Sequence, residues 1–370
     1  MKDKIKYNII IAGGGTGGHL IPAFSIADAL KLNPSFKGEV QFVGSKYGLE
    51  SKLYAKRKEK SHIIDIRGII RTISLYSTYQ NVIVLPLKFI FALIRVFKIF
   101  VRFKPHIVIG TGGYSSAIPL LIGFLLGIKI VLQEQNAVLG LVNRIFYKAA
   151  DIVFFGFTPS YIDKKSNYIV TGNPIINNIK NIDFKAFKNE IKFKDNFTVF
   201  ILGGSQGSAP INSHFLKKYN DYLKMGIQIV WQCGDKNLEE INKKVQSNNI
   251  HLFGFTNSID KYYRISDLVI SRAGALTISE LSFYKKASIL IPFPLSANNH
   301  QVKNAEYYMS KGASEIVFQN ELKEGLLENK VKRMYENRDI IKKMEKKSSD
   351  IVVGDAASHI VSEILKLNIK

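Results

Sequence analysis

Three glycine-rich turns constrain what this chain can fold into more than any other feature. They lie at residues 13–19, 110–114 and 203–207, and each follows a strand-like apolar run and precedes a helix-like one. Glycine allows positive φ angles and a close approach of ligand to backbone, and the following helix presents its free N–H groups there. The repeated device therefore predicts phosphate or sugar binding at the edges of parallel sheets.

Composition and charge narrow the class of protein. A chain of 370 residues is long for a single core, so two α/β domains are expected. The one cysteine, Cys233, excludes a disulfide framework and a cysteine-rich metal site. A first strand at residues 7–12 leaves no room for a signal peptide, so we expect the protein to stay where it is made. The net charge of +22 favours nucleic acid, anionic lipid or an acidic small molecule as a partner.

Two series of apolar runs predict the fold class. The runs are 7–12, 39–44, 106–110, 128–133, 151–156 and 168–172, then 197–204, 227–232, 250–255, 267–271 and 288–293. Unbroken Val, Ile and Leu are typical of parallel strands covered on both faces. We predict two doubly wound, Rossmann-like α/β domains facing each other across a cleft, with ligands at the carboxyl ends of the strands. The expected parts are an N-terminal domain (1–172), a polar linker (173–196), a C-terminal domain (197–350) and a helix returning to the N-terminal domain (351–370).

Residues 82–104 form the other unusual stretch. They are apolar except at a few positions, and four cations, Lys88, Arg95, Lys98 and Arg102, interrupt the run, which argues against a membrane span. All four share one helical face. The apolar side chains Phe89, Leu93, Val96, Phe97 and Phe100 lie elsewhere on that helix. On a membrane, Phe89, Leu93, Phe97 and Phe100 would enter the acyl boundary, and the four cations would meet anionic headgroups. Two interpretations stay open, a crossover helix packed in the core and a helix lying on a membrane surface. The basic surroundings favour a cytoplasmic leaflet.

The first turn suggests a general base. Gly13, Gly15 and Gly18 fit the dinucleotide pattern, but the second strand ends in 43–45 without the acidic residue that holds a ribose. His19 stands where a Walker loop has its lysine, which argues against that loop. A histidine at a helix start beside glycines is suited to taking a proton, and the alternative is a residue that only packs or caps.

The third turn matches the nucleophile-elbow pattern of hydrolases. Ser205 would be its nucleophile, but a hydrolase elbow belongs in a single-sheet domain with an acid and then a histidine following, whereas Ser205 lies at the first strand of the second domain. Candidate histidines do follow, at His214, His251, His300 and His359. We therefore favour Ser205 as a phosphate or nucleotide ligand, and spacing alone does not exclude the hydrolase interpretation.

Residues 267–305 carry the strongest local pattern. A strand is followed by a small-residue turn at 272–275 and a helix that carries Glu280. Backbone amides at Ala275 to Thr277 could meet a diphosphate, and Glu280 could accept two hydrogen bonds from a ribose diol; the alternative for Glu280 is a solvated helix carboxylate. Neutral polar side chains that suit a hexose follow at Asn298, Asn299, His300, Gln301 and Asn304. D-x-D, H-E-x-x-H and C-x-x-C patterns are absent, so no metal site is predicted.

These ordered motifs closely resemble the MurG family of GT-B glycosyltransferases, from Gly13 to Ala356. They are GGTGGHLIPA at 14–23, GTGGYSSAIP at 110–119, EQNAVLGLVNR at 134–144, TGNP at 171–174, LGGSQGS at 202–208, SRAGALTISE at 271–280 and HQVKNA at 300–305. The resemblance implies an inverting transfer of N-acetylglucosamine from UDP-N-acetylglucosamine to the C4 hydroxyl of the muramyl sugar of lipid I, which gives lipid II in peptidoglycan synthesis. It implies no cofactor.

The resemblance also implies which residues bind the two substrates. Implied donor contacts are Thr16, Gly17, Gly18, Asn136, Ser205, Thr256 through its backbone, Ala275, Leu276, Thr277, Glu280, Gln301 and Asn304. Implied acceptor contacts are Gly15, Gly18, His19, Gly112, Gly113 and Tyr114, with His19 as the catalytic base. Because lipid I has a polyprenyl tail, the implied location is peripheral, on the cytoplasmic face of the plasma (inner) membrane, with no nucleic-acid partner.

One departure and two rival interpretations remain. The family often has an arginine near the donor phosphates after G-N-P-V, whereas Ile176 stands here, so the helix N-terminus or another basic residue, with Arg272 as the candidate, would have to serve. A different GT-B enzyme, such as a diacylglycerol glycolipid synthase or a nucleotide-sugar epimerase, would share both domains. A basic RNA-binding module would account for the charge but leave the glycine turns without a role.

Overall fold

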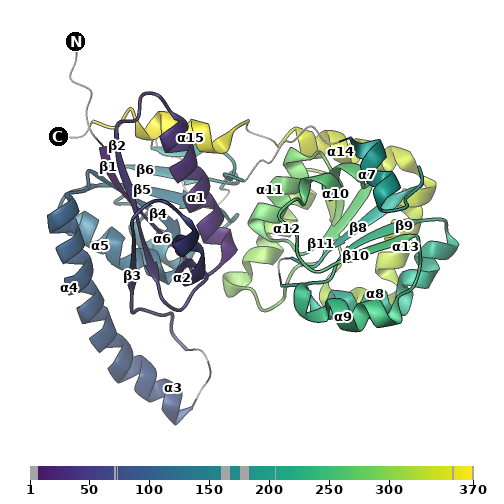
Figure 1. Ribbon diagram of the computed structural model, residues 1–370, viewed down its shortest axis with the longest axis horizontal. Coiled ribbons are helices and arrows are strands. Elements are labelled where there is room, and N and C mark those ends of the chain that lie inside the picture. Colours follow the sequence, from purple (N-terminus) through teal and green to yellow (C-terminus); the bar gives the residue numbers. More distant parts are fainter. Residues whose placement is uncertain are drawn as a thin grey trace. The chain divides into compact units, whose positions relative to one another are not determined.

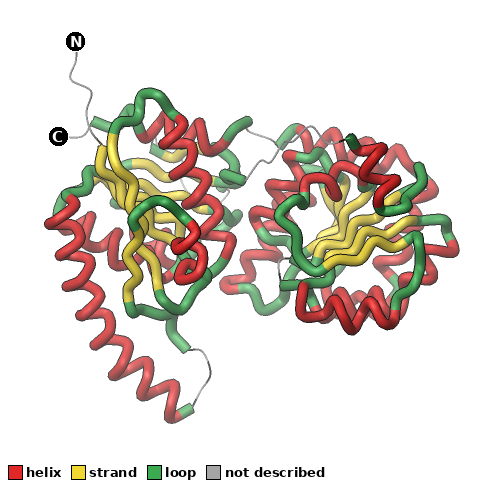
Figure 2. Tube along the Cα trace, viewed as in Figure 1, coloured by secondary structure: helices red, strands yellow, loops and turns green. Residues whose placement is uncertain are grey.

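The computed structural model describes residues 7–70, 72, 74–159, 167–175, 183–204, 206–351 and 354–368. The chain divides into two compact units: unit 1 is Met1–Ile176 with Val353–Lys370, and unit 2 is Asn177–Val352. Each unit is a twisted sheet with helices on both faces (Figures 1 and 2). Ser205 and Ile176, singled out from the sequence, lie outside the described residues.

Unit 1 is built on seven parallel strands in the order β3-β2-β1-β4-β5-β6-β7. They are β1 (Tyr7–Gly13), β2 (Gly38–Ser45), β3 (Ser61–Ile64), β4 (Ile107–Gly112), β5 (Lys129–Glu134), β6 (Ile152–Phe155) and β7 (Tyr168–Val170). The strand order reverses between β1 and β4, the switch point at which doubly wound sheets bind ligands. The first two glycine turns follow these two strands, so the fold brings them to the same place.

Helices cover both faces of this sheet. They are α1 (Gly17–Leu32), α2 (Glu50–Leu53), α3 (Leu75–Tyr79), α4 (Leu85–Phe103), α5 (Ala117–Leu125), α6 (Leu141–Phe146) and α15 (Ala356–Ile364), with short turns η1 (Tyr54–Lys56), η2 (Gln80–Val84) and η3 (Tyr114–Ser116). Successive β1 residues alternate between two cores, because Ile9 packs with α1 and α15 whereas Ile10 packs with α4 and α5. The C-terminal helix α15 thus belongs to unit 1, where Ile360 and Ile364 are fully buried.

Unit 2 repeats the design with six parallel strands in the order β10-β9-β8-β11-β12-β13. They are β8 (Thr198–Leu202), β9 (Gln228–Gln232), β10 (Ile250–Phe253), β11 (Leu268–Ser271), β12 (Ala287–Leu290) and β13 (Ser314–Ile316). The helices are α7 (Phe184–Glu190), α8 (Ala209–Lys224), α9 (Asp235–Lys244), α10 (Asp260–Ile265), α11 (Ala275–Phe283), α12 (His300–Ser310), α13 (Leu326–Glu336) and α14 (Arg338–Ser349), with turns η4 (Ala297–Asn299) and η5 (Gln319–Glu324). Its switch point lies between β8 and β11, which precede the third glycine turn and the turn at 272–275. The predicted α/β class is confirmed in both units.

Two segments differ from the sequence-based expectation. The short strands β3 and β13 were not predicted, because three or four residues give too little periodicity. The described part of the expected linker contains α7, a helix of unit 2. Asp183 caps it by accepting hydrogen bonds from the amides of Lys185 and Ala186, and Phe187 is buried against the Tyr262 ring, with centroids 5.4 Å apart. One buried aromatic residue and one cap therefore suffice to fix a helix in a polar stretch.

The helix over residues 82–104 has one face in the core and one in solvent. Ala92, Val96, Ile99 and Phe100 of α4 are buried, so Phe100, expected on the free apolar face, belongs to the core. The exposed apolar side chains are Val82, Ile83, Leu87, Ile90, Phe91, Ile94, Phe97 and Val101, which we call the α4 stripe. Figure 1 shows α4 leading away from the sheet to α3 at its far end. None of the helices described here combines the length and apolar character needed to cross a bilayer.

Candidate functional site

The first two glycine turns contact each other directly at the switch point of unit 1. The Gly14 amide donates to the Gly112 carbonyl over 3.3 Å. A Cβ atom at Gly113 would lie 2.3 Å from the Gly14 carbonyl oxygen, and one at Gly112, whose φ is +96°, would lie 2.8 Å from Nδ1 of His19. Larger residues would push the two turns apart, so glycine here sets the geometry around His19.

A buried carboxylate that the sequence reading missed fixes the first turn. Glu50, fully buried at the start of α2, accepts from the Gly15 amide over 2.8 Å and from the Ser45 amide over 3.0 Å. The Tyr54 hydroxyl donates to the Gly13 carbonyl over 3.1 Å, and burial raises the pKa of Tyr54. A lone Glu in a short helix carries no sequence signal for this role, since only the fold brings it under the turn.

The start of α1 is open to a ligand. Its N-cap residue, Thr16, is extended and its side chain makes no capping hydrogen bond. The first amides of a helix, here those of Gly17 and Gly18, have no intrahelical acceptor, and the first turn carries no acidic side chain. Tyr114 lies beside this turn, because a Cβ at Gly15 would be 3.6 Å from its ring, and burial raises the pKa of Tyr114. These features suit a polar or anionic group at the helix end.

His19 is held by hydrogen bonds both at its backbone carbonyl and at its imidazole ring. Its carbonyl accepts from the Thr111 hydroxyl over 2.8 Å. Its ring Nδ1 lies 3.0 Å from the Thr111 carbonyl and 3.0 Å from Oε1 of Gln135. A backbone carbonyl can only accept a hydrogen bond, so Nδ1 carries the proton and Nε2 keeps its lone pair. The ring is therefore in the tautomer that a general base using Nε2 requires.

Asn136 follows β5 in a loop organised by Glu134. Glu134 is 1% exposed; its Oε1 accepts from the backbone and side-chain amides of Asn136 over 3.0 and 3.1 Å. Its Oε2 accepts from the Gly140 amide over 2.8 Å and from Nδ2 of Asn143 over 2.9 Å. The acidic residue of the EQN motif thus builds the loop that presents Asn136.

In unit 2, the start of α11 provides the second open helix end. Its N-cap, Gly274, is extended, no side chain caps the helix, and the first turn contains no acidic residue. The amides of Ala275, Leu276 and Thr277 are therefore the free donors of this helix end. The third glycine turn directly follows β8, the strand that pairs with β11. In this turn the Gly207 amide donates to the Gly204 carbonyl over 2.9 Å. The two turns border one switch point, as an anion site would require.

Arg272 supports this switch point and has no donor left for a direct phosphate contact. Its Nε and Nη2 donate to the Ser208 hydroxyl over 3.2 and 2.8 Å, and Nη2 also donates to Oε1 of Gln319 over 2.7 Å. Its Nη1 donates to the carbonyls of Ile291 and Pro292 over 3.1 and 3.2 Å. All five N–H groups are thus used on neutral acceptors. The suggestion that Arg272 replaces the family arginine as a direct ligand is not supported by this geometry. Burial lowers its pKa to about 10, so it stays charged near neutral pH.

The remaining predicted donor residues of unit 2 lie around α11 and α12 or beyond β10. The Tyr263 hydroxyl donates to Oε2 of Glu280 over 2.8 Å, and burial raises the pKa of Glu280 to about 7. Asn304 is fully buried and its Nδ2 donates to the Ala273 carbonyl over 3.3 Å, which ties α12 to the α11 turn. Oε1 of Gln301 accepts from the Phe293 amide over 2.9 Å. Thr256, beyond the carboxyl end of β10, accepts from the Ser258 amide over 3.1 Å.

The structure therefore gathers the predicted residues in two groups, one in each unit. In unit 1, Gly15 to His19, Gly112 to Tyr114 and Asn136 border the β1/β4 switch point. In unit 2, Ala275 to Thr277, Glu280 and Asn304 border the β8/β11 switch point. Within the described ranges, no three His, Cys, Asp or Glu side chains are placed to hold a metal ion.

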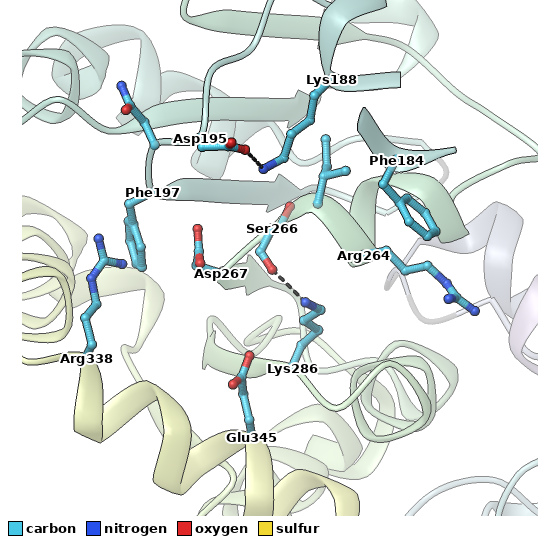
Figure 3. A pocket seen from close by; sticks show the side chains of 12 residues that line it. Phe184, Lys188, Asp195, Phe197, Arg264, Ser266, Asp267, Lys286, Arg338 and Glu345 are labelled. Atoms are coloured by element: carbon cyan, nitrogen blue, oxygen red, sulfur yellow. Dashed lines mark hydrogen bonds and ion pairs between the residues drawn. The ribbon is translucent and has the colours of Figure 1, made fainter. Parts of the chain in front are cut away.

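A polar cavity of about 450 Å³ lies at the opposite end of the unit 2 strands from the switch point (Figure 3). Its lining includes Asp267 and Lys286, which precede β11 and β12, so it faces the amino ends of the strands. Lys188 pairs with Asp195 over 2.9 Å, and Nζ of Lys286 donates to the Ser266 carbonyl over 2.7 Å. Burial lowers the pKa of Lys286. None of the predicted donor residues lines this cavity.

Comparisons with known proteins agree with this geometry. Residues 9–155 match the glycosyltransferase family 28 N-terminal domain, and residues 198–361 match the glycosyltransferase family 28 C-terminal domain. The chain is 34% identical to a Flavobacterium psychrophilum protein over 98% of each chain, and 33% identical to a Finegoldia magna protein over 97% of this chain and 98% of that one. Both are named UDP-N-acetylglucosamine--N-acetylmuramyl-(pentapeptide) pyrophosphoryl-undecaprenol N-acetylglucosamine transferase.

A solved structure points the same way. The crystal structure of Acinetobacter baumannii MurG is 26% identical, superimposes with a TM-score of 0.77, and is covered over 98% of this chain and 100% of that one. The sequence relatives exceed 30% identity over nearly the whole chain, and the two family 28 domains occur in the expected order. The chain therefore belongs to the MurG family of N-acetylglucosamine transferases, within glycosyltransferase family 28 and with the GT-B fold.

Proposed function

We propose that this protein transfers N-acetylglucosamine from UDP-N-acetylglucosamine to the C4 hydroxyl of the muramyl sugar of lipid I, giving lipid II. The observation that carries the proposal is the state of His19, whose Nδ1 faces two oxygen acceptors and whose Nε2 keeps its lone pair beside the first two glycine turns. The relatives named for this reaction support the same substrates.

In the proposed reaction the acceptor hydroxyl attacks the anomeric carbon from the face opposite UDP. The bond from that carbon to the diphosphate oxygen breaks, and the configuration inverts. His19 takes the hydroxyl proton on Nε2. The open amides at the start of α11 stabilise the charge that develops on the leaving diphosphate. Arg272, which hydrogen-bonds Ser208 beside this turn, adds a positive charge without contacting the phosphates directly.

We assign the other predicted contacts on the same grounds. Glu280 accepts hydrogen bonds from the uridine ribose, and the Thr256 backbone contacts the uracil. Further donor contacts are Thr16, Gly17, Gly18, Asn136, Ser205, Gln301 and Asn304, of which Ser205 lies outside the described residues. Gly15, Gly18, Gly112, Gly113 and Tyr114 bind the acceptor around His19. The open helix ends of α1 and α11 support these assignments.

A radiolabel transfer assay tests the function. The protein is incubated with labelled UDP-N-acetylglucosamine and a lipid I analogue, and the expected product is a labelled disaccharide lipid. The same reaction with diacylglycerol as the acceptor tests the glycolipid synthase interpretation. Label that moves only to diacylglycerol, or free sugar released without any acceptor, would overturn the proposal.

We further propose that unit 1 attaches peripherally to the cytoplasmic face of the plasma membrane through the α4 stripe. The acceptor's polyprenyl tail stays in the bilayer, so the enzyme must meet it at the surface. The stripe exposes large side chains such as Phe91, which is 70% exposed, and Arg95, Lys98 and Arg102 flank it in solvent. Apolar insertion with basic flanks is the chemistry of interfacial helices on anionic lipid.

The structure corrects two details of the sequence-based expectation for this face. Phe89 and Leu93 are partly buried against the core, so together with Phe100 they are unavailable to lipid. Nζ of Lys88 donates to the Tyr47 hydroxyl over 2.6 Å and to Oδ1 of Asp65 over 3.0 Å, so this cation is engaged within unit 1. Vesicle binding must therefore be tested on the exposed stripe and on the solvated cations.

A further inference from the structure

A chain of three buried side-chain amides ends on His19. Asn173 is 5% exposed, and Gln133 and Gln135 are 0% and 1% exposed. Nε2 of Gln133 donates to Oδ1 of Asn173 over 3.0 Å, and Nε2 of Gln135 donates to Oε1 of Gln133. Oε1 of Gln135 then lies 3.0 Å from Nδ1 of His19. These amides come from β5, its following residue and the segment after β7, and the sequence reading assigned none of them a role near the base.

Backbone carbonyls fix the direction of two amides in this chain, those of Asn173 and Gln135, and these two orient Gln133 between them. Nδ2 of Asn173 donates to the Gln135 carbonyl over 3.0 Å. Nε2 of Gln135 donates to the Thr111 carbonyl over 2.7 Å and to the Gln133 carbonyl over 3.2 Å. Carbonyl oxygens cannot donate, so the NH₂ groups of Asn173 and Gln135 must lie on those sides. A flipped Gln135 would place its oxygen against the carbonyl oxygens of Thr111 and Gln133, an arrangement in which acceptor faces acceptor.

The same direction determines what His19 meets. The oxygen of Gln135 is turned to Nδ1, where the Thr111 carbonyl also points, so both groups demand a proton on Nδ1. We propose that Gln135, oriented by Gln133 and Asn173, is a positioning residue that holds His19 as the Nδ1–H tautomer with Nε2 free to take the acceptor proton. The inference deepens the proposed function, because it rests on His19 being the base of that reaction.

The positioning group is neutral, and that distinguishes it from a carboxylate orienter. A carboxylate beside Nδ1 would also stabilise the imidazolium and raise the pKa of the base. Titratable groups on the surrounding described elements include Glu50 on α2, Tyr54 on η1, Tyr114 on η3 and Glu134 on β5. Both carboxylates are engaged with amides, those of Gly15 and Ser45 for Glu50 and those of Asn136, Gly140 and Asn143 for Glu134. The amide chain thus fixes the ring orientation without placing a carboxylate against Nδ1.

The far end of the chain is also built for this contact. A Cβ atom at Gly156, just after β6, would lie 2.1 Å from Oδ1 of Asn173. Any larger residue would displace the Asn173 amide from Gln133. Glycine at position 156 is therefore needed for Asn173 to keep its place in the amide chain.

The decisive measurement is the tautomer of His19, read by long-range ¹H–¹⁵N NMR on protein with labelled histidine. The His19→Gln variant assigns the signal among the seven histidines. We expect Nδ1–H in the wild-type protein and a mixture of tautomers in Gln135→Met, with kcat about ten- to a hundredfold lower and the donor KM unchanged. Gln135→Glu should move the acidic limb of the kcat profile upward by about one pH unit.

A second glutamine–histidine pair supplies the matched control. Oε1 of Gln41, which is 5% exposed, lies 2.8 Å from Nε2 of His62 in the same unit. Gln41→Met should leave the His19 signal and kcat unchanged. If Gln135→Met does not fold, Gln133→Met tests the chain one step away, because it spares the contact of Gln135 with Thr111.

The outcomes separate this inference from the proposed function. An Nε2–H tautomer in the wild-type protein, or an unchanged tautomer and kcat in both Gln135→Met and Gln133→Met, would overturn the positioning role. A near wild-type kcat in His19→Ala, together with the Nδ1–H tautomer in the wild-type protein, would instead overturn the role of His19 as base.

Discussion

Tyr263 donates a hydrogen bond from its fully buried hydroxyl to Oε2 of Glu280 over 2.8 Å, linking α10 to α11. Burial raises the pKa of Glu280 to about 7, and the Tyr263 hydrogen bond limits the rise. In the proposed donor contact, the ionised carboxylate of Glu280 accepts two hydrogen bonds from the ribose diol. The protonation of this one group would then link donor binding to pH.

We predict that affinity for UDP-N-acetylglucosamine rises about tenfold from pH 6 to pH 8, as Glu280 ionises through its pKa of about 7. Isothermal titration calorimetry at the two pH values measures this. The Glu280→Gln variant should bind more weakly at pH 8 and lose most of the pH dependence. An equal pH dependence in Glu280→Gln would assign the effect to another group.

The same shift predicts how the free protein responds to pH. The folded-state pKa of Glu280 lies above its model value of 4.5, so the folded state holds its proton more tightly than the unfolded state. This contribution to stability is complete below about pH 4.5 and is lost as pH rises through about 7. Wild-type stability relative to Glu280→Gln should therefore fall across this window, as measured by urea unfolding. A relative stability that rises with pH would contradict the burial argument.

His19→Ala should lower turnover by about two to four orders of magnitude, because the acceptor hydroxyl loses its base. Donor affinity should stay near wild type, since donor binding also relies on α11 of unit 2. Single-turnover transfer and calorimetry on the same preparation separate the two effects, with circular dichroism as the folding control. Weakened donor binding equal to the loss in rate would point to a binding role.

The double variant Ile90→Ser with Phe91→Ser should release the protein from anionic vesicles while it keeps donor affinity and stability, because both side chains are exposed. Leu295→Ser, at a residue of unit 2 that is 78% exposed, is the matched control and should bind vesicles normally. Arg95→Glu with Arg102→Glu should weaken binding mainly at low salt. Co-sedimentation that is unchanged in both double variants would place the membrane surface elsewhere.

Arg272→Lys should destabilise unit 2 by about 2 kcal/mol, because one ammonium cannot satisfy Ser208, Gln319 and two backbone carbonyls together. Thermal unfolding with and without UDP measures the change. Ser208→Ala removes only one acceptor and should cost less. A stable Arg272→Lys protein that loses UDP binding alone would show a direct phosphate contact, against the geometry described above.

Much of the architecture was predictable because its signals come from residues that are close together in the sequence. Unbroken apolar runs identified most of the strands, and the glycine turns marked where β1, β4 and β8 end. The start of α11 was predictable for the same reason, since a small-residue turn followed by a helix is a short-range pattern. The strands β3 and β13 were missed because they are short, and α7 was missed because its stability depends on Phe187 meeting Tyr262, far along the chain.

The sequence by itself determined the family, the α/β class and the set of candidate residues, since motifs and apolar periodicity are properties of neighbouring positions. Only the tertiary structure decided the partners of those residues. His19 acquires its tautomer from Thr111 and Gln135, which are 92 and 116 positions away. Glu50 comes to lie under the Gly15 turn, Arg272 uses its donors on four neutral groups, and α4 turns Phe100 inward and Phe91 outward. A hydrogen bond or a buried face depends on which distant segments meet. The packing of each sheet with its own helices decides that.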